Sequence, residues 1–174
     1  AQLAGFENIF DATVEAAHPE RGTMTCRLAQ TGKGEPVLLE TPLVRAEVGS
    51  GLRVGVRAGD ILLATSLPQG LSARNVIPGR VASLEQRDVI VSARLNCGAV
   101  DCGVEMEVHL TLAARDSLQL MPGREVWLVI KTHSCHLVET RARAGRQRGA
   151  GSERWIHGHH AAPAEPAAPL PAGP

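Results

Sequence analysis

Two short segments of the chain combine hydroxyl, amide and cationic side chains at the ends of predicted strands. Residues 72–75 read Ser-Ala-Arg-Asn, and residues 131–134 read Lys-Thr-His-Ser. These groups are mainly hydrogen-bond donors, and one guanidinium and one ammonium add positive charge. Such a mixture suits a tetrahedral dianion, because cations alone bind any anion whereas neutral donors fixed by the fold select for size. The segments predict an oxyanion site, with a capped turn and a solvated arginine as the alternative.

No other motif in the chain predicts catalysis. A glycine-rich phosphate loop ending in Lys-Ser or Lys-Thr, a nucleophile elbow and a paired-histidine metal motif are all missing from the sequence. Three cysteines and two histidines could in principle ligate zinc, but their spacing does not fit the usual paired knuckles. We therefore expect no catalytic residues, no cofactor and no metal site, and we expect Cys26, Cys97, Cys102 and Cys135 to be reduced core thiols.

Charge and composition exclude several classes of partner. The 174 residues contain 18 Lys and Arg against 18 Asp and Glu, so no net field attracts nucleic acid. Aromatic residues make up only 2%, which also argues against base stacking. No apolar run approaches the roughly 20 residues that span a bilayer, and the first ten residues lack the pattern of an export signal. These features predict a cytoplasmic protein that does not bind nucleic acid.

Hydrophobic alternation predicts that most of the ordered chain is β-structure. One short helix is expected at residues 112–120, capped by Thr111 and ended by a Met-Pro-Gly sequence. Residues 3–10 form an apolar lead that could pack as a turn of helix. The predicted strands are 11–16, 23–28, 52–57 and 61–64 in the first half, and 79–84, 89–95, 104–110 and 125–131 in the second.

The two halves repeat the same plan. Strand 52–57 corresponds to strand 126–131, and each ends on a cation that is followed by a break. The repeat predicts an all-β fold with two tandem small barrels of the OB type, at residues 1–67 and 68–140. A single β-sandwich is the structural alternative. Residues 141–174 are first basic and then rich in Ala and Pro, a composition that predicts a disordered tail.

Three stretches of the second half resemble the Mop-type (TOBE) domain. They are Ser-Ala-Arg-Asn-Val-Ile-x-Gly-x-Val at 72–81, residues 118–123, and Val-Trp-x-x-Ile-Lys at 126–131. This domain occurs in molybdate-binding proteins, in the molybdenum-responsive regulator, and at the C-terminus of the ATP-binding subunit of molybdate importers. Residues 3–12 resemble the join between the ATPase and that C-terminal domain, which implies that an ATPase domain precedes this region in the family.

The resemblance implies a ligand and a set of contacts. Molybdate or tungstate would be bound by Ser72, Ala73 and Arg74 of one subunit, with Lys131 and Thr132 of its partner in a homodimer. It also implies a regulatory module that senses cytoplasmic molybdate and acts on membrane permease subunits from the inner face of the membrane. The alternatives are a free-standing molybdate storage protein and a ligand-free TOBE domain that serves only for dimerisation in another importer.

Overall fold

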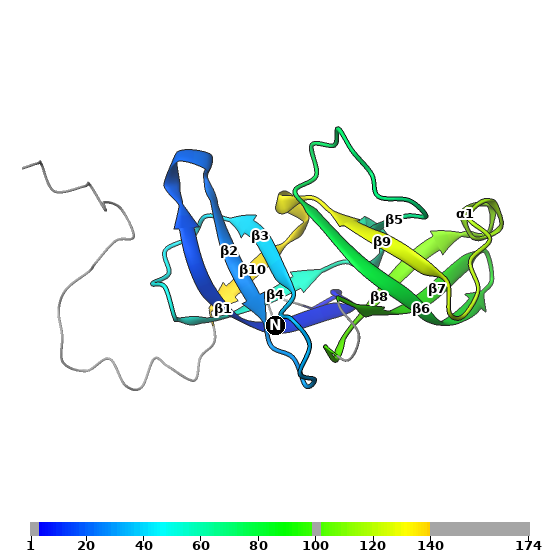
Figure 1. Ribbon diagram of the computed structural model, residues 1–174, viewed down its shortest axis with the longest axis horizontal. Helices are drawn as coiled ribbons and strands as arrows, with labels where there is room; N and C mark the ends of the chain where they lie inside the picture. The colour runs from blue at the N-terminus through cyan, green and yellow to red at the C-terminus, as the bar shows by residue number, and fades with distance from the viewer. Residues whose placement is uncertain (1–3, 99–101, 140–174) are drawn as a thin grey trace, which may run out of the picture.

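The fold consists of two antiparallel sheets, each curled into a half-barrel, as the computed structural model of residues 4–98 and 102–139 shows (Figure 1). The predicted mostly-β fold with one short helix is confirmed. The expected disorder of residues 141–174 falls outside the described residues. No helix in the described part of the chain is long and apolar enough to cross a membrane.

The first sheet has five strands in the order β10-β4-β1-β2-β3. Neighbouring strands are antiparallel throughout. A short turn joins β1 to β2, and a longer loop, residues 29–37, joins β2 to β3. Two single-turn 3-10 helices interrupt this half, η1 (Pro19–Arg21) and η2 (Ala58–Asp60). Its strands are β1 (Asn8–His18), β2 (Thr23–Leu28), β3 (Leu38–Pro42), β4 (Gly51–Val56) and β10 (His136–Glu139).

The second sheet also has five strands, in the order β5-β9-β6-β7-β8. Helix α1 (Leu112–Ser117) follows β8, and the Thr111 hydroxyl accepts a hydrogen bond from Ala114 N at 3.0 Å, so the predicted cap is confirmed. A third 3-10 turn, η3 (Thr132–Ser134), follows β9. The strands are β5 (Leu62–Ala64), β6 (Asn75–Arg87), β7 (Ile90–Cys97), β8 (Val104–Thr111) and β9 (Glu125–Ile130).

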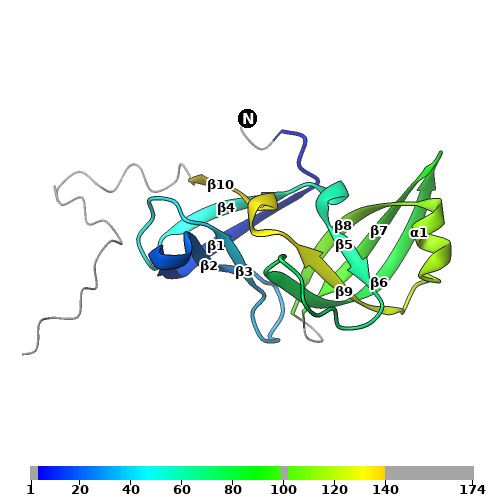
Figure 2. The ribbon, with the colours of Figure 1, turned by 90° about the horizontal axis from the view of Figure 1, so that it is seen from above.

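Each half gives its last strand to the other sheet. Strand β5 pairs with β9, and β10 pairs with β4, as the views in Figures 1 and 2 show. The strand predicted at residues 61–64 is present as β5, but it pairs in the second sheet and not with the strands of the first half. The physical reason is that β4 and β9 each leave one edge unpaired within their own half, and the exchanged strand covers that edge. The boundary at residues 67 and 68 remains a prediction.

The internal repeat extends to details of strand pairing. Strand β1 shifts register against β2 between Val14 and Ala16, and β6 shifts against β7 between Val81 and Ser83. At the start of each shift, the backbone of Val14 or Val81 makes the same pair of hydrogen bonds. Val14 bonds to Gly49 and Ser50 before β4, and Val81 bonds to Gly123 and Arg124 before β9. The two halves are therefore two copies of one unit, related residue by residue.

Strand β1 begins earlier than the alternation pattern indicated. Residues 8–11 pair with 53–56 of β4, so this part of the apolar lead is strand and not a turn of helix. The core is a single cluster with residues from both sheets. It consists mainly of Val, Leu and Ile side chains, together with Met24, Met106 and all four cysteines. The methionines fill space that aromatic rings occupy in other cores.

Candidate functional site

The two predicted cations lie at the same end of one strand pair. Asn75 opposite Ile130 is the final pair of the antiparallel strands β6 and β9. Arg74 comes directly before Asn75 and Lys131 directly after Ile130, so their backbones leave the sheet side by side. Both residues are exposed. The structure therefore brings together two segments that lie far apart in the sequence, with 56 positions from Asn75 to Lys131.

Thr132 adds a hydroxyl without a partner. It opens η3, whose turn is closed by backbone bonds from Ser134 N to Lys131 O at 3.0 Å and from Cys135 N to Thr132 O at 3.1 Å. The Thr132 Oγ1 atom is buried and has no hydrogen-bond partner among the described residues. A buried polar group without a partner is costly, so this hydroxyl is a donor that the described residues leave unsatisfied.

The remaining predicted residues lie on the approach to β6. Ser72 is exposed and Ala73 is half-buried, and both come from the loop between β5 and β6. The ends of β6 and β9 therefore gather all five predicted residues into one junction between loop and sheet. We call the group Ser72, Ala73, Arg74, Lys131 and Thr132, together with the facing strand β3, the first junction.

Sequence reasoning missed an acidic residue in the first junction. Glu40 of β3 places its carboxylate Oε2 3.8 Å from Arg74 Nε. Its backbone is held by the Asn75 side chain, which accepts from Glu40 N at 2.7 Å and donates to Glu40 O at 2.9 Å. Asn75 thus pairs with the free edge of β3 as a strand would. The sequence predicts this amide as a donor for an anion, whereas in the structure it bonds to Glu40 and links the two halves.

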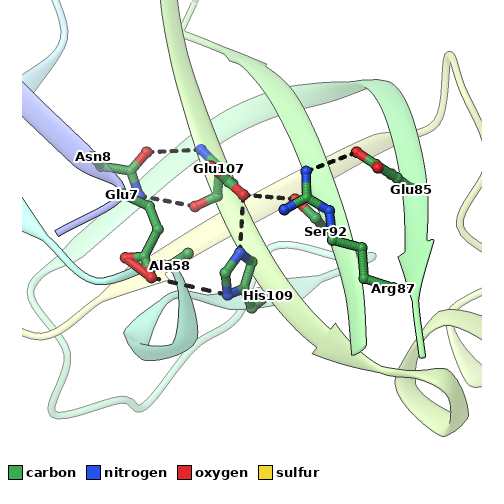
Figure 3. Close-up of polar contacts among 8 residues, drawn as sticks. All are labelled: Glu7, Asn8, Ala58, Glu85, Arg87, Ser92, Glu107 and His109. Carbon is green, nitrogen blue, oxygen red and sulfur yellow. Dashed lines mark hydrogen bonds and ion pairs between the residues drawn. The ribbon is translucent and has the colours of Figure 1, made fainter. Parts of the chain in front are cut away.

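The same arrangement recurs at the other end of the repeat. Asn8 is only 4% exposed, as is Asn75. Its side chain accepts from Glu107 N at 2.7 Å and donates to Glu107 O at 2.8 Å, now on the free edge of β8 (Figure 3). Strand β8 also packs against η2, as β3 packs against η3. We call this group around Asn8, Glu107 and η2 the second junction.

The second junction has different chemistry. Glu7 precedes Asn8, where Arg74 precedes Asn75, and its Oε2 accepts a hydrogen bond from Ala58 N at 3.3 Å. Ala58 opens η2 as Thr132 opens η3. Arg57 takes the place of Lys131, and its guanidinium lies over the Phe6 ring, 4.3 Å from the centroid. At this junction the backbone N–H that begins the turn therefore donates its hydrogen bond to a carboxylate of the same chain.

A titratable cluster surrounds that carboxylate. Glu107 Oε1 lies 2.9 Å from His109 Nε2 and accepts the Ser92 hydroxyl at 2.8 Å (Figure 3). The other ring nitrogen, His109 Nδ1, is 4.0 Å from Glu7 Oε1. Hydrogen bonds from His109 and then Ser92 lower the pKa of the Glu107 carboxyl, because they stabilise its charged form. The cluster links the start of β1 to β8. It presents carboxylate acceptors, whereas an anion site needs hydrogen-bond donors.

All four cysteines are buried and free, as predicted. Burial raises the pKa of Cys97 and of Cys135 to about 12, since a thiolate is poorly solvated there. Within residues 4–98 and 102–139, no group of three or more His, Cys, Asp or Glu side chains is placed to hold a metal ion.

The fold and the first junction define a class of domain. Residues 71–137 match the family model of the TOBE domain, so the second half of the chain, with the start of β10, is a TOBE domain. The chain is related to the C-terminal region of ATP-binding proteins that import molybdenum.

Two such relatives show the extent of the similarity. The molybdenum import ATP-binding protein ModC of Rhizobium meliloti is 38% identical over 96 residues, which is 55% of this chain and 26% of that protein. The molybdate/tungstate import ATP-binding protein WtpC of Pyrococcus horikoshii is 30% identical over 139 residues, which is 79% of this chain and 34% of that protein. The chain therefore spans about a quarter to a third of the length of these relatives.

A solved structure covers both halves of the chain. The cytoplasmic molybdate-binding protein ModG, crystallised with molybdate bound, superimposes with a TM-score of 0.62 at 25% sequence identity. The match covers 78% of this chain and 97% of ModG. The two-half architecture is thus shared with a protein that consists of little else.

Proposed function

We propose that the chain is an oxyanion-binding module for molybdate or tungstate, and that the first junction is its site. The observation that carries the proposal is the placement of Arg74 and Lys131 at one strand end beside the unpartnered Thr132 hydroxyl. Two cations match the charge of a dianion, and the hydroxyls of Ser72 and Thr132 supply directed donors. The names of the relatives support the choice of ligand, since they describe a molybdenum importer, a molybdate/tungstate importer and a molybdate-binding protein.

The site is completed in a homodimer. Ser72 and Arg74 are exposed, so one chain surrounds an anion only in part. In the proposed assembly, the strand end that carries Arg74 and Lys131 faces the partner, so that the segment 72–74 of one subunit and residues 131–132 of the partner contact the same ion. The anion then neutralises cations that would repel each other across the interface, and binding stabilises the dimer by an amount set by the anion concentration relative to its dissociation constant.

The cellular role follows from the relatives. As part of an importer's ATP-binding subunit, the module would sense cytoplasmic molybdate and modulate transport through the membrane permease subunits. This is a coupling between two sites, and it requires the anion to prefer one arrangement of the dimer. The likeness to nearly the whole of ModG favours a second candidate function, a molybdate-binding protein that buffers the ion without an ATPase.

Calorimetric titration of the full chain with molybdate, tungstate and sulfate tests the binding site. We expect Lys131→Ala to weaken molybdate binding and Ser72→Ala to reduce the preference over sulfate. The matched control is Arg53→Ala, which removes an exposed cation of β4 that pairs with Asp11 at 3.3 Å. Equal affinity for molybdate and sulfate in the wild type, or unchanged binding in Lys131→Ala, would leave a structural TOBE domain without a ligand.

A further inference from the structure

A carboxylate already lies where the proposed anion must bind. Glu40 Oε2 is 3.8 Å from Arg74 Nε, and the side chain of Glu40 is 20% exposed against 57% for Arg74. Strand β3, which carries Glu40, also contacts η3, the turn that begins with Thr132. The acidic group therefore belongs to the same junction as the proposed ligands, although it comes from the other half of the chain.

The position of Glu40 is set by its main chain and not by its charge. Both backbone polar groups of Glu40 are bonded to the Asn75 side chain, at 2.7 and 2.9 Å. Asn75 itself is only 4% exposed and directly follows Arg74. The fold thus places a carboxylate beside Arg74 through hydrogen bonds that involve only the backbone of Glu40.

From these contacts we propose that Glu40 is an internal competitor of the oxyanion and sets the affinity of the site. The inference rests on the proposed function of the first junction. In the free protein the Glu40 carboxylate neutralises Arg74; a bound dianion takes its place on the guanidinium, and the displaced carboxylate turns toward solvent. The separation of 3.8 Å and the exposure of Arg74 describe a loose ion pair, which contributes little stability and is easily exchanged.

The charges of the junction give the direction of the effect. With Glu40 ionised, Arg74 and Lys131 leave a net charge of one positive unit to meet a dianion. Removing the carboxylate raises this to two units and removes a like charge near the ligand. Glu40 therefore lowers the affinity for every fully deprotonated dianion and allows the site to release its ligand as the anion concentration falls.

The test is calorimetric titration of the full chain and its Glu40→Gln variant with sodium molybdate at low ionic strength. We expect Glu40→Gln to bind about three- to tenfold more tightly, with a smaller gain at high salt because screening weakens the repulsion. The fold should be preserved, because the bonds to Asn75 use only the backbone of residue 40; an unchanged urea midpoint checks this. Glu40→Asp withdraws the carboxylate by one methylene and should give an intermediate gain.

Glu125→Gln is the matched control. Glu125 pairs with Arg80 at 3.0 Å at the opposite end of the same strands, so this variant loses an equal charge away from the junction. This control is compared at an ionic strength of about 0.1 M, where the Debye length of about 10 Å is shorter than the roughly 17 Å that five strand residues span, and there we expect its affinity to stay within about twofold of the wild type. If the wild type binds molybdate but Glu40→Gln binds no more tightly, the inference is overturned while the proposed function stands. If neither binds, both fall.

Discussion

Replacing Asn75 by alanine tests the link between the two halves and the proposed anion site in one experiment. The Asn75 side chain makes two hydrogen bonds to the backbone of Glu40, at 2.7 and 2.9 Å. A hydrogen bond of this kind contributes about 0.5–1.5 kcal/mol net, and leaving its buried partner unsatisfied costs about 1–3 kcal/mol. Because Glu40 is only partly buried, water can reach its freed groups in part. We therefore expect Asn75→Ala to lower the free energy of unfolding by about 2–3 kcal/mol.

Asn8→Ala is an internal control for this change. Asn8 is equally buried and makes the same two bonds to the backbone of Glu107, at 2.7 and 2.8 Å. The two variants should lose similar stability in urea, with unchanged m-values, because each removes an equivalent pair of hydrogen bonds between the two halves. Only Asn75→Ala should also alter molybdate affinity, since only Asn75 adjoins Arg74 and fixes Glu40.

Two results would refute this reasoning. A loss below about 0.5 kcal/mol for either variant would mean that the bonds to the free strand edges contribute little to the fold. A loss of molybdate affinity in Asn8→Ala as large as that in Asn75→Ala would mean that the effect comes from general destabilisation and not from the first junction. The titrations should be run well below the urea midpoint of each variant, so that both are folded.

Three further outcomes are expected. Gly79→Ala should be destabilising by about 1–3 kcal/mol, because its Cβ would lie 2.5 Å from a leucine methyl group of β9, whereas Gly59→Ala, with nothing within 4 Å, should change the urea midpoint little. Since the fold lowers the pKa of Glu107, its ionised form stabilises the protein above the pKa of the unfolded chain; this contribution is lost as pH falls through the folded pKa, so Glu107→Gln should flatten the loss of stability below about pH 4.5. Cys97 and Cys135 should react with a thiol reagent only upon unfolding, and reaction in the native state would contradict their burial.

The strands and the helix could be predicted from local patterns because each depends on nearby residues. Thr111 and the Met-Pro-Gly sequence bracket α1 correctly, to within three residues at its end. The alternation of residues 104–110 coincides with β8. The exchange of β5 and β10 could not be predicted in this way, because any strand of three or four residues fits either sheet by pattern alone. Its position depends on which edge remains free after all other strands have paired.

The site shows the same division between local and long-range information. Arg74 and Lys131 could be singled out because Arg74 directly precedes one recognisable strand signal and Lys131 directly follows another, each near hydroxyl-bearing residues. Glu40 gave no such signal, since it is one acidic residue in a short strand of the other half. It enters the junction through its backbone bonds with Asn75, a contact 35 positions away in the sequence. The repeat offered one clue, because Asn8 and Asn75 occupy corresponding positions.

The two junctions differ in a way that accounts for the proposed anion site lying in only one of the two repeated halves. Both place a buried asparagine against the free edge of a strand, and both set a glutamate backbone and a 3-10 turn beside it. At the second junction the chain supplies its own anion, because the Glu7 carboxylate accepts the backbone N–H of Ala58. At the first junction Arg74 stands at the position of Glu7, and its partner is the more distant carboxylate of Glu40. The shared contacts maintain the fold in both halves. The change from Glu7 to Arg74 at the corresponding position can therefore alter the charge of the junction, and with it the ligand, without disturbing the fold.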